Sequence, residues 1–287
     1  MTNCNSCESE KHKELFNIKK HKIVQCQTCN LKYIKNPMTP EESKEYYESE
    51  YYQGTDGTAS TSCYSKVENF RIKEAEERLN RLGKTSSILD VGCGTGYFIS
   101  AASRKNISAI GIDLSQNAVD YGKKKGLNLI QGDLLNISCL ENKSFDTITF
   151  WASIEHLLKP RETLQKAYEL LKTKGQIIIE TGNVDSYLSK IYGKNWRLIQ
   201  EDHNFYFSQK TLDMLLKNTG FKTIKTEKDG FVESIITQLG LRSFILKKFS
   251  ESEENIKNKS SSLKELINQS ASYFGLGDVM IKTAVKI

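Results

Sequence analysis

A glycine-rich turn could bring a ligand close to bare backbone. Gly92, Gly94 and Gly96 stand between the apolar run SILDV and the helical pattern YFISAASRK. Side chains at these three positions would block the approach of a ligand to the main chain. The spacing is G-x-G-x-G, because Tyr97 stands where a dinucleotide fingerprint has its third glycine, so the turn alone does not identify the ligand.

Three aspartates accompany this turn, each near the end of an apolar run. Asp90 precedes the first glycine, within reach of an ammonium group or an ordered water. Asp113 comes about 20 residues after the first glycine, where a carboxylate accepts both hydroxyls of a ribose. Asp133 could accept a hydrogen bond from the exocyclic amine of a base. Three acids and no lysine in the turn favour a ligand with a ribose, a base and a positive charge but no phosphates, which describes S-adenosylmethionine.

Four cysteines near the start of the chain have the spacing of metal ligands. Cys4 and Cys7 form one C-x-x-C pair, Cys26 and Cys29 form a second, and 18 residues separate the pairs. Two such pairs can present four thiolates to Zn2+ in a tetrahedron. Because a segment this short buries little apolar surface, we expect the metal to contribute to its folding. The alternatives are reduced thiols without a metal or a redox pair, and the two histidines between the pairs are expected to lie in solvent.

The elements that must position these residues alternate between strand and helix. From Tyr64 onward, apolar runs are separated by segments with helical periodicity. The expected strands are 87–92, 107–113, 127–133, 144–151, 175–182, 221–231 and 278–287, and the expected helices are 66–82, 97–105, 115–126, 161–173 and 208–220, with a short helix from Pro40 capped by Thr39. Continuous apolar strands between helices imply a parallel sheet covered on both faces.

Composition limits the function classes. The chain has 287 residues and a net charge of +6, with lysines spread over helices rich in glutamate, which is typical of a solvated surface rather than a nucleic-acid face. No apolar run approaches the roughly 18 residues of a membrane helix and the N-terminus is polar, so we expect a cytoplasmic protein without membrane insertion. Three parts are expected: a zinc-ribbon domain (1–36), a helical linker or lid (37–62), and a large domain (63–287) with a helical insert at 233–274.

Taken together, the motifs of the large domain resemble a known family. ILDVGCGTGYF, GIDLS, QGDLL and FDTITFWASIEHL, between about Ser86 and Phe221, resemble the motifs of class I S-adenosylmethionine-dependent methyltransferases in order and spacing. The resemblance implies a Rossmann-like, seven-stranded, mostly parallel α/β sheet with helices on both faces and an antiparallel last strand. It also implies these cofactor contacts: Asp90, Gly92, Gly94 and Gly96 around the methionine and ribose, Asp113 with Leu114 at the ribose, Asp133 with Leu134 at the adenine, and Trp151 from the fourth motif. Within the family, the likeness is greatest to small-molecule methyltransferases with an N-terminal cysteine ribbon.

Two histidines outside the ribbon are candidates for catalysis. Methyl transfer from a sulfonium requires alignment of the acceptor, and a base only where the acceptor loses a proton. His156 follows the fourth strand, where it acts as a base or positions the acceptor, or only braces its loop. His203 lies in a loop whose aromatic residues either wall an acceptor or pack the loop on the sheet. The resembling ubiquinone-type O-methyltransferases have an E-x-x-E-H stretch associated with a divalent metal, but Ala152 replaces its first glutamate here, which argues against a catalytic metal.

The sequence therefore predicts an S-adenosylmethionine-dependent methyltransferase that forms S-adenosylhomocysteine and methylates a small-molecule acceptor, at oxygen, with nitrogen or carbon as alternatives. One rival function is RNA methylation with the ribbon as an RNA-reading arm. Dispersed charge and the absence of an N-P-P-Y-like motif after the fourth strand stand against it. Another is a non-catalytic, cofactor-sensing scaffold. Nucleic acid is not an expected partner, and a homodimer is left open.

Overall fold

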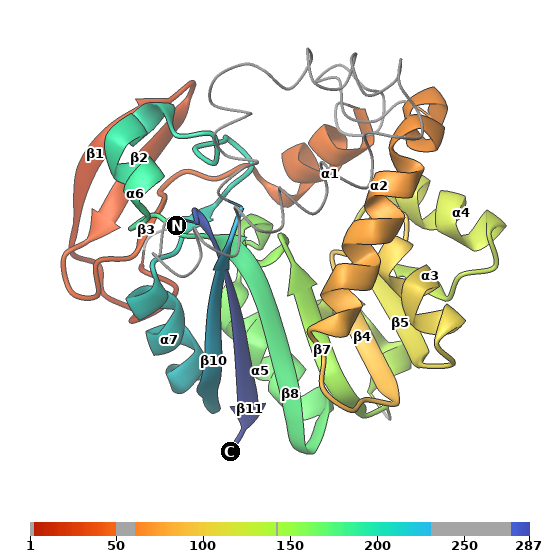
Figure 1. Cartoon of the computed structure of the whole chain (residues 1–287). Helices are drawn as coiled ribbons and strands as arrows, with labels where there is room; N and C mark the ends of the chain where they lie inside the picture. Colours follow the sequence, from red (N-terminus) through yellow and green to blue (C-terminus); the bar gives the residue numbers. More distant parts are fainter. Residues whose placement is uncertain (1–2, 50–60, 142, 231–276) are drawn as a thin grey trace.

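The computed structural model describes residues 3–49, 61–141, 143–230 and 277–287 (Figure 1). Its centre is a seven-stranded sheet with the order β10-β11-β8-β7-β4-β5-β6. These strands are β4 (Ser87–Val91), β5 (Ser108–Asp113), β6 (Leu129–Gln131), β7 (Phe145–Trp151), β8 (Leu171–Gly182), β10 (Phe221–Asp229) and β11 (Val279–Lys286). Strands β4 to β8 pair in parallel, and β11 runs antiparallel to both of its neighbours. The expected seven-stranded, mostly parallel sheet is confirmed.

Helices cover both faces of this sheet (Figure 1). They are α2 (Thr61–Asn80), α3 (Tyr97–Arg104) and α4 (Gln116–Lys124) on one face, and α5 (Pro160–Leu170) and α7 (Gln209–Asn218) on the other. Successive strand residues point to opposite faces, so Ile88 packs in the core beneath α2 and α3 whereas Leu89 packs in the core beneath α5 and α7. Burial on both faces explains why the strands read as continuous apolar runs.

Polar caps fix where the site helices begin. The hydroxyl of Ser115 accepts from the Ala118 N–H at 3.3 Å and starts α4, as expected from the sequence. Thr39 and Glu42 exchange side-chain and backbone hydrogen bonds at the start of α1 (Pro40–Ser49), which confirms Thr39 as its cap. Ser208 and Thr211 form the same reciprocal pair at α7.

The N-terminal residues form a second, antiparallel sheet. Its strands β1 (His12–Ile18), β2 (His21–Cys26) and β3 (Lys32–Ile34) follow one another, and the fourth is β9 (Phe205–Tyr206), from the distant part of the chain. A short helix, α6 (Tyr187–Tyr192), lies beside this sheet (Figure 1). The sheet of the cysteine-bearing segment is therefore completed by a strand that begins two residues after His203.

Some expected boundaries differ from the structure. The helix expected over 161–173 ends at Leu170, because Leu171 already pairs with Phe145 in the sheet. His21 was expected in solvent but is 1% exposed, with its Nδ1 2.8 Å from the carbonyl oxygen of Asn36. The expected insert at 233–274 and residues 50–60 of the expected linker lie outside the described residues. Among the residues that are described, no helix is long and apolar enough to cross a membrane.

Candidate functional site

The turn between β4 and α3 lies at the carboxyl end of the sheet, with Gly92 exposed, Gly94 half-buried and Gly96 buried. Gly92, Gly94 and Gly96 have φ angles of 77°, 54° and 86°, which favour glycine. A Cβ at Gly92 would lie 2.5 Å from the Cβ of Ser153. Ser153 is itself held in place, because its hydroxyl donates to the Val91 carbonyl at 2.6 Å. A side chain at position 92 would therefore displace the loop that follows β7.

Asp113 is fixed against this turn by two backbone hydrogen bonds. Its Oδ2 accepts from the Gly94 N–H at 2.7 Å, and its Oδ1 accepts from the Ser115 N–H at 2.9 Å. Burial raises the pKa of Asp113, and these two hydrogen bonds oppose the rise. A carboxylate has about four lone-pair positions, so each oxygen keeps a free position for a donor from a ligand. The half-buried side chain is thus both rigid and able to hold a diol.

Asp90 lies beneath the turn and is 2% exposed. Its Oδ1 accepts from the Thr149 hydroxyl at 2.7 Å. Burial raises the pKa of Asp90 to about 7, with a contribution from the charge of Asp113, whereas the Thr149 hydrogen bond and the charge of Arg78 act in the opposite direction. A cationic ligand nearby would favour the charged carboxylate.

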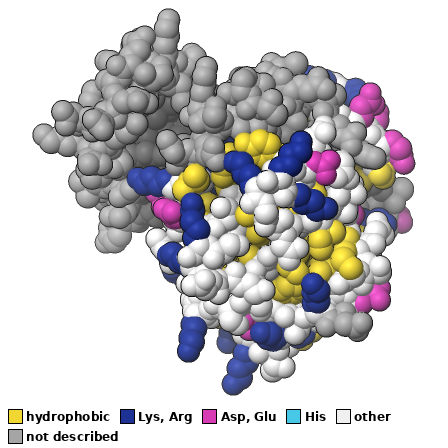
Figure 2. Space-filling model, turned by 90° about the vertical axis from the view of Figure 1, so that its right-hand side faces the viewer, with side chains coloured by type: hydrophobic (Ala, Val, Ile, Leu, Met, Phe, Trp, Pro, Cys, Tyr) yellow, Lys and Arg dark blue, Asp and Glu magenta, His cyan; other side chains and the backbone are white. Residues whose placement is uncertain are grey.

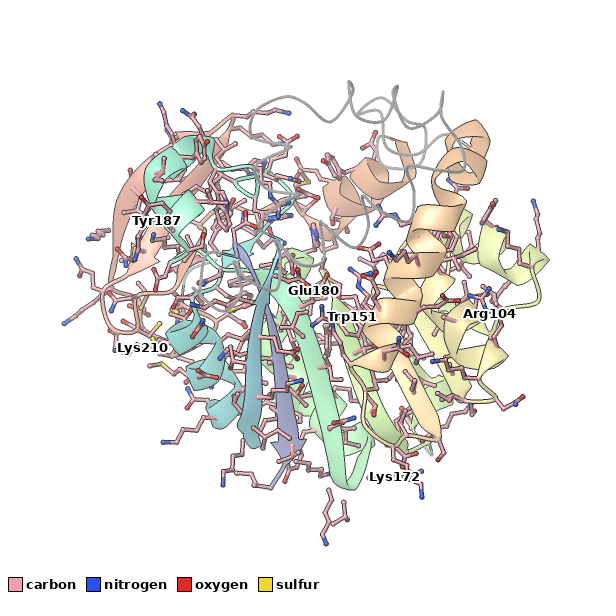
Figure 3. The ribbon with its side chains drawn as sticks, in the orientation of Figure 1. Arg104, Trp151, Lys172, Glu180, Tyr187 and Lys210 are labelled. Atoms are coloured by element: carbon pink, nitrogen blue, oxygen red, sulfur yellow. The ribbon has the colours of Figure 1, made fainter. Side chains whose placement is uncertain are left out.

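Trp151 and Glu180 are neighbours where β7 and β8 end. Their Cα atoms are paired across the sheet, and Figure 3 shows both at the end opposite Lys172. Arg78 of α2 forms an ion pair with Glu180, with Nη2 2.5 Å from Oε1, and its guanidinium lies 5.3 Å from the centre of the Trp151 ring. The Trp151 Nε1 is buried and has no partner among the described residues. A buried donor without an acceptor costs free energy, so this nitrogen is a candidate contact for a ligand.

Asp133 and Leu134, expected at the adenine, and Leu114, expected beside Asp113, differ in how their side chains are exposed. Asp133 caps the short turn η1 (Leu134–Asn136), with its Oδ1 accepting from the Leu135 N–H at 3.1 Å. The side chain of Leu134 is 1% exposed and belongs to the core, so only its backbone can face a ligand. Leu114 is 41% exposed beside Asp113 and can cover one face of a ring.

His156 and His203 converge although they lie in different loops. His156 ends the turn η3 (Ile154–His156) after β7, and His203 precedes β9. Their ring centres lie 4.6 Å apart in an edge-to-face arrangement. The Nδ1 of His156 lies 3.0 Å from the carbonyl oxygen and 3.3 Å from the carboxylate Oδ2 of Asp202. Both of these contacts fix the proton of His156 on Nδ1.

The two imidazoles carry different charges. Burial lowers the pKa of His156, but the hydrogen bond and charge of Asp202 outweigh it and raise the value to about 9. Burial opposes ionisation of Asp202, but His156 holds the pKa of this carboxyl at about 2. Burial and the charge of His156 lower the pKa of His203 to about 3. At neutral pH the pair therefore holds a cation at His156 and a neutral imidazole at His203, one a donor and the other a proton acceptor.

A carboxylate joins this pair. One ligand atom each from Glu155, His156 and His203 lies within 4.8 Å of the others, as around a metal ion. Glu155 is buried, its Oε2 has no partner among the described residues, and burial raises its pKa. Asp202 holds the proton on Nδ1, so ligation would use Nε2 and would require a neutral His156, which the charge of Asp202 opposes. Against a catalytic metal stands Ala152, which replaces the first glutamate of the E-x-x-E-H stretch.

The four N-terminal cysteines come together as metal ligands do. The sulfurs of Cys4 and Cys29 are 3.5 Å apart, as are those of Cys7 and Cys26, and all four lie within 4.8 Å of one another. Tetrahedral Zn2+ with Zn–S bonds of about 2.3 Å would place its sulfurs about 3.8 Å apart. The donor set and its spacing fit a structural zinc ion.

The aromatic residues near His203 pack the loop. Trp196, Phe205, Tyr206 and Phe207 are each at most 4% exposed. The Trp196 Nε1 donates to Asp278 at 2.7 Å. Of the two interpretations left open by the sequence, packing of the loop is the one that agrees with their burial.

Sequence patterns did not single out several residues of this region. Asp202 adjoins His203 in the chain, but no pattern connects it with His156. Asn204 links the two histidine loops, since its Nδ2 donates to the His156 carbonyl at 2.7 Å. Glu180 carried a usable signal, because it is a lone charged residue at the end of the apolar run QIIIE.

Comparisons with known proteins identify the family of this chain. A family model described as "Methyltransferase domain" matches residues 67–226. An uncharacterized protein of Methanocaldococcus jannaschii is 31% identical over 58% of this chain and 80% of its own length. The demethylmenaquinone methyltransferase of Lactococcus lactis is 26% identical over 53% of this chain and 73% of its own length.

Two further similarities concern acceptor chemistry and fold. A ubiquinone biosynthesis O-methyltransferase of Coxiella burnetii is 29% identical over 44% of this chain and 56% of its own length. The crystal structure of an S-adenosylmethionine-dependent methyltransferase from Archaeoglobus fulgidus has a TM-score of 0.54 and 23% identity, over 78% of this chain and 99% of that one. This structure shares the fold.

Proposed function

Because the chain belongs to the methyltransferase-domain family and is an S-adenosylmethionine-dependent methyltransferase, we propose that it methylates an oxygen of a small-molecule acceptor. Nitrogen and carbon are the alternative acceptor atoms. The observation that carries the proposal is the histidine pair at the carboxyl end of the sheet, which offers a donor and a proton acceptor at neutral pH.

In this proposal the cofactor lies along the glycine turn. S-adenosylmethionine supplies an activated methyl group on a sulfonium. Asp113 accepts from its ribose hydroxyls, and the buried Asp90 balances its positive charge beside Gly92, Gly94 and Gly96. The following residues contact the rest of the molecule: Asp133 and the backbone of Leu134 at the adenine, Leu114 over one ring face, and the Trp151 indole.

The histidines act on the acceptor side. The charge of His156 acts on Asp113, which supports a location next to the cofactor. His156, as a cation, donates a hydrogen bond that orients the acceptor. His203, as a neutral imidazole, takes the proton of the acceptor hydroxyl as the new bond to carbon forms. A weak base is sufficient for this step, because the oxygen becomes strongly acidic once it is methylated.

The relatives support a small acceptor, and one of them supports an oxygen atom. The Coxiella protein is named for O-methylation in ubiquinone biosynthesis, and the Lactococcus protein is named for demethylmenaquinone, so both names refer to small molecules. We also propose that Cys4, Cys7, Cys26 and Cys29 hold a structural Zn2+ ion.

The distribution of charge supports a small acceptor over RNA. On the face shown in Figure 2, the described lysines and arginines stand apart, with hydrophobic and uncharged atoms between them. Binding to phosphates is stronger where such residues gather in one stripe.

The alternative of a non-catalytic scaffold predicts that the protein binds the cofactor but transfers no methyl group.

Methyl-labelled S-adenosylmethionine tests the proposal. The protein is incubated with hydroxylated aromatic compounds and sugars in one series and with RNA in another, and the label is located after separation. We expect label in a small molecule, and a loss of kcat by about a hundredfold or more in His203→Gln with unchanged affinity for S-adenosylhomocysteine. The control is His12→Gln, because His12 lies on β1 of the N-terminal sheet. Label in RNA alone, or full turnover of His203→Gln, would contradict it.

A further inference from the structure

Residues 3–36, the cysteine-bearing segment, are called the ribbon from here on. The ribbon forms contacts with the chain on both sides of His203. On one side, the Lys19 ammonium lies 2.6 Å from the Glu201 carboxylate. On the other side, the Ile34 N–H donates to the Asn204 carbonyl at 2.9 Å, and Tyr33 of β3 pairs with Phe205 of β9. Asp202 and His203 thus lie between two points that the ribbon holds.

The same ribbon also holds the start of α5, which follows the loop of His156. Arg161 in the first turn of α5 donates to the Ser6 carbonyl at 3.0 Å and to the Glu8 carboxylate at 2.6 Å. The Arg161 N–H donates to Asn5 Oδ1 at 2.8 Å. Asn5 and Ser6 stand between the first two cysteines, so a metal ion bound there would fix their backbone.

The ribbon packs in the same hydrophobic core as β9 and α5. Cys4, Cys26 and Cys29 are at most 3% exposed and lie in one hydrophobic core with Phe205 of β9 and Leu164 of α5. Such closely packed interiors transmit displacements rather than absorb them. A change at the four sulfurs would therefore reach β9 and α5 together.

A direct link connects the two histidine loops. Asn204 receives the ribbon hydrogen bond at its carbonyl and donates from its side chain to the His156 carbonyl at 2.7 Å. By contrast, the hydrogen bonds that hold Asp113 come from Gly94 and Ser115, in the turns that follow β4 and β5. The ribbon contacts thus concern the acceptor side and not the ribose side of the site.

We propose that the metal-loaded ribbon is a positioning element of the acceptor site. Through β3 and through its contacts with Arg161, it fixes the position of the His203 loop relative to the His156 loop. The proposal rests on the proposed function for the role of the two histidines. A displacement of about 1 Å at a reacting group can cost about a hundredfold in rate. Loss of the metal is therefore expected to reduce turnover while the cofactor still binds.

The test compares full-length protein with and without zinc. Three quantities are measured: affinity for S-adenosylhomocysteine by calorimetry, kcat and KM, and the titration of His156 by NMR of histidine-labelled protein. Without zinc we expect the affinity to stay within about twofold, kcat to fall by about ten- to a hundredfold, and the midpoint of His156 to move from about 9 toward its ordinary value of 6.5. An unchanged kcat and an unchanged titration would overturn the proposal.

A variant keeps the test valid if the metal-free protein unfolds. Arg161→Ala removes the side-chain contacts with Ser6 and Glu8 while zinc stays bound. Lys166→Ala is the control, because Lys166 lies on the same helix and pairs with Glu169 at 3.1 Å, away from the ribbon. We expect Arg161→Ala to lower kcat by about tenfold and to shift the His156 titration, and Lys166→Ala to do neither. Equal behaviour of the two variants would contradict the coupling.

Failure of the proposed function would look different. If no form of the protein transfers a methyl group but the His156 titration still responds to zinc, the role of the histidines is wrong and the coupling stands. If turnover is normal and insensitive to both zinc and Arg161→Ala, the function stands and the coupling is wrong.

Discussion

At the level of single residues, the carboxylate of Asp202 gives two neighbouring histidines different charges. Both imidazoles are buried, which by itself lowers the pKa of each. Asp202 contacts His156 and restores its charge, and the charge on His156 then holds His203 neutral. One positive charge on the pair is the stable state over a wide range of pH, so donor and acceptor roles are assigned before an acceptor molecule arrives.

The variant Asp202→Asn tests this assignment through the pH dependence of kcat. The groups facing His156 are Asp202, Glu155, Asp113 and His203. The active form has His156 protonated, so kcat falls as pH rises through about 9. Removal of the carboxylate charge leaves burial dominant, and we expect the basic limb to move to lower pH by about two units or more.

The control for this substitution is Asp185→Asn, which changes an exposed aspartate in the segment after β8. Its basic limb should match that of the wild type. A rate that rises toward pH 9 in the wild-type protein would instead make His156 the base, and would reverse the roles given to the two histidines.

Local sequence signals were sufficient to predict that Asp90 and Asp113 lie close together. They were insufficient to predict how the residues of the acceptor side are arranged. Asp90 and Asp113 each stand at the end of an apolar strand, so their convergence follows from the parallel sheet. The contact of His156 with Asp202 joins two loops, and hydrophobic periodicity carries no information on how loops meet. The sequence could name both histidines but could not tell that they touch.

At the scale of elements, the turn from β4 to α3 has two separate requirements. It needs a positive φ at Gly92, and it needs empty space beside Ser153. Gly126 has the same φ of 77° but nothing within 4 Å of the Cβ it lacks. Substitutions at these two positions therefore distinguish the cost of backbone strain from the cost of a steric clash.

We expect Gly126→Ala to cost about 1 kcal/mol of the free energy of unfolding, because only the backbone conformation is strained. Gly92→Ala adds a contact of 2.5 Å with Ser153 and should cost about 3 kcal/mol or more, with weaker binding of S-adenosylhomocysteine. Denaturant unfolding and calorimetry measure the two effects. Equal destabilisation by both substitutions would show that the space beside Ser153 is not limiting.

Long elements were predictable and short ones were not. The strands and helices of the large sheet follow from periodicity, and Ser115 marked the start of α4 correctly. Strand β9 has only two residues and forms by pairing with β3, far away in the sequence. No local pattern can indicate such a strand, although it connects the cysteines to the histidine loop.

At the scale of the whole molecule, the ribbon and the large sheet share one hydrophobic core. The ribbon residues Cys4, Leu31 and Tyr33 pack in the same core as Leu212 and Phe221. Elements with a common core unfold together. Cysteine spacing indicates a ribbon at the start of the chain but does not indicate that this ribbon shares a hydrophobic core with the large sheet.

Thermal unfolding tests whether the ribbon and the large sheet unfold together. We expect zinc-loaded protein to unfold in one transition, and a chelator to lower the midpoint of that whole transition, because metal binding stabilises only the folded form. Chelator already saturated with zinc is the control and should leave the midpoint unchanged. Two transitions, with only the lower one sensitive to chelator, would mean that the ribbon folds independently.

The proposed function depends first on the binding of S-adenosylmethionine by the glycine turn and Asp113. Calorimetric titration with S-adenosylmethionine and S-adenosylhomocysteine tests it most directly, using the wild type, Asp113→Ala, and Asp120→Ala as a control on the exposed side of α4. We predict micromolar binding to the wild type and to Asp120→Ala, and at least about a hundredfold weaker binding to a folded Asp113→Ala, because charged hydrogen bonds to the ribose are lost. No binding to the wild type, or equal binding to all three proteins, would mean that Asp113 and the glycine turn do not form the cofactor site.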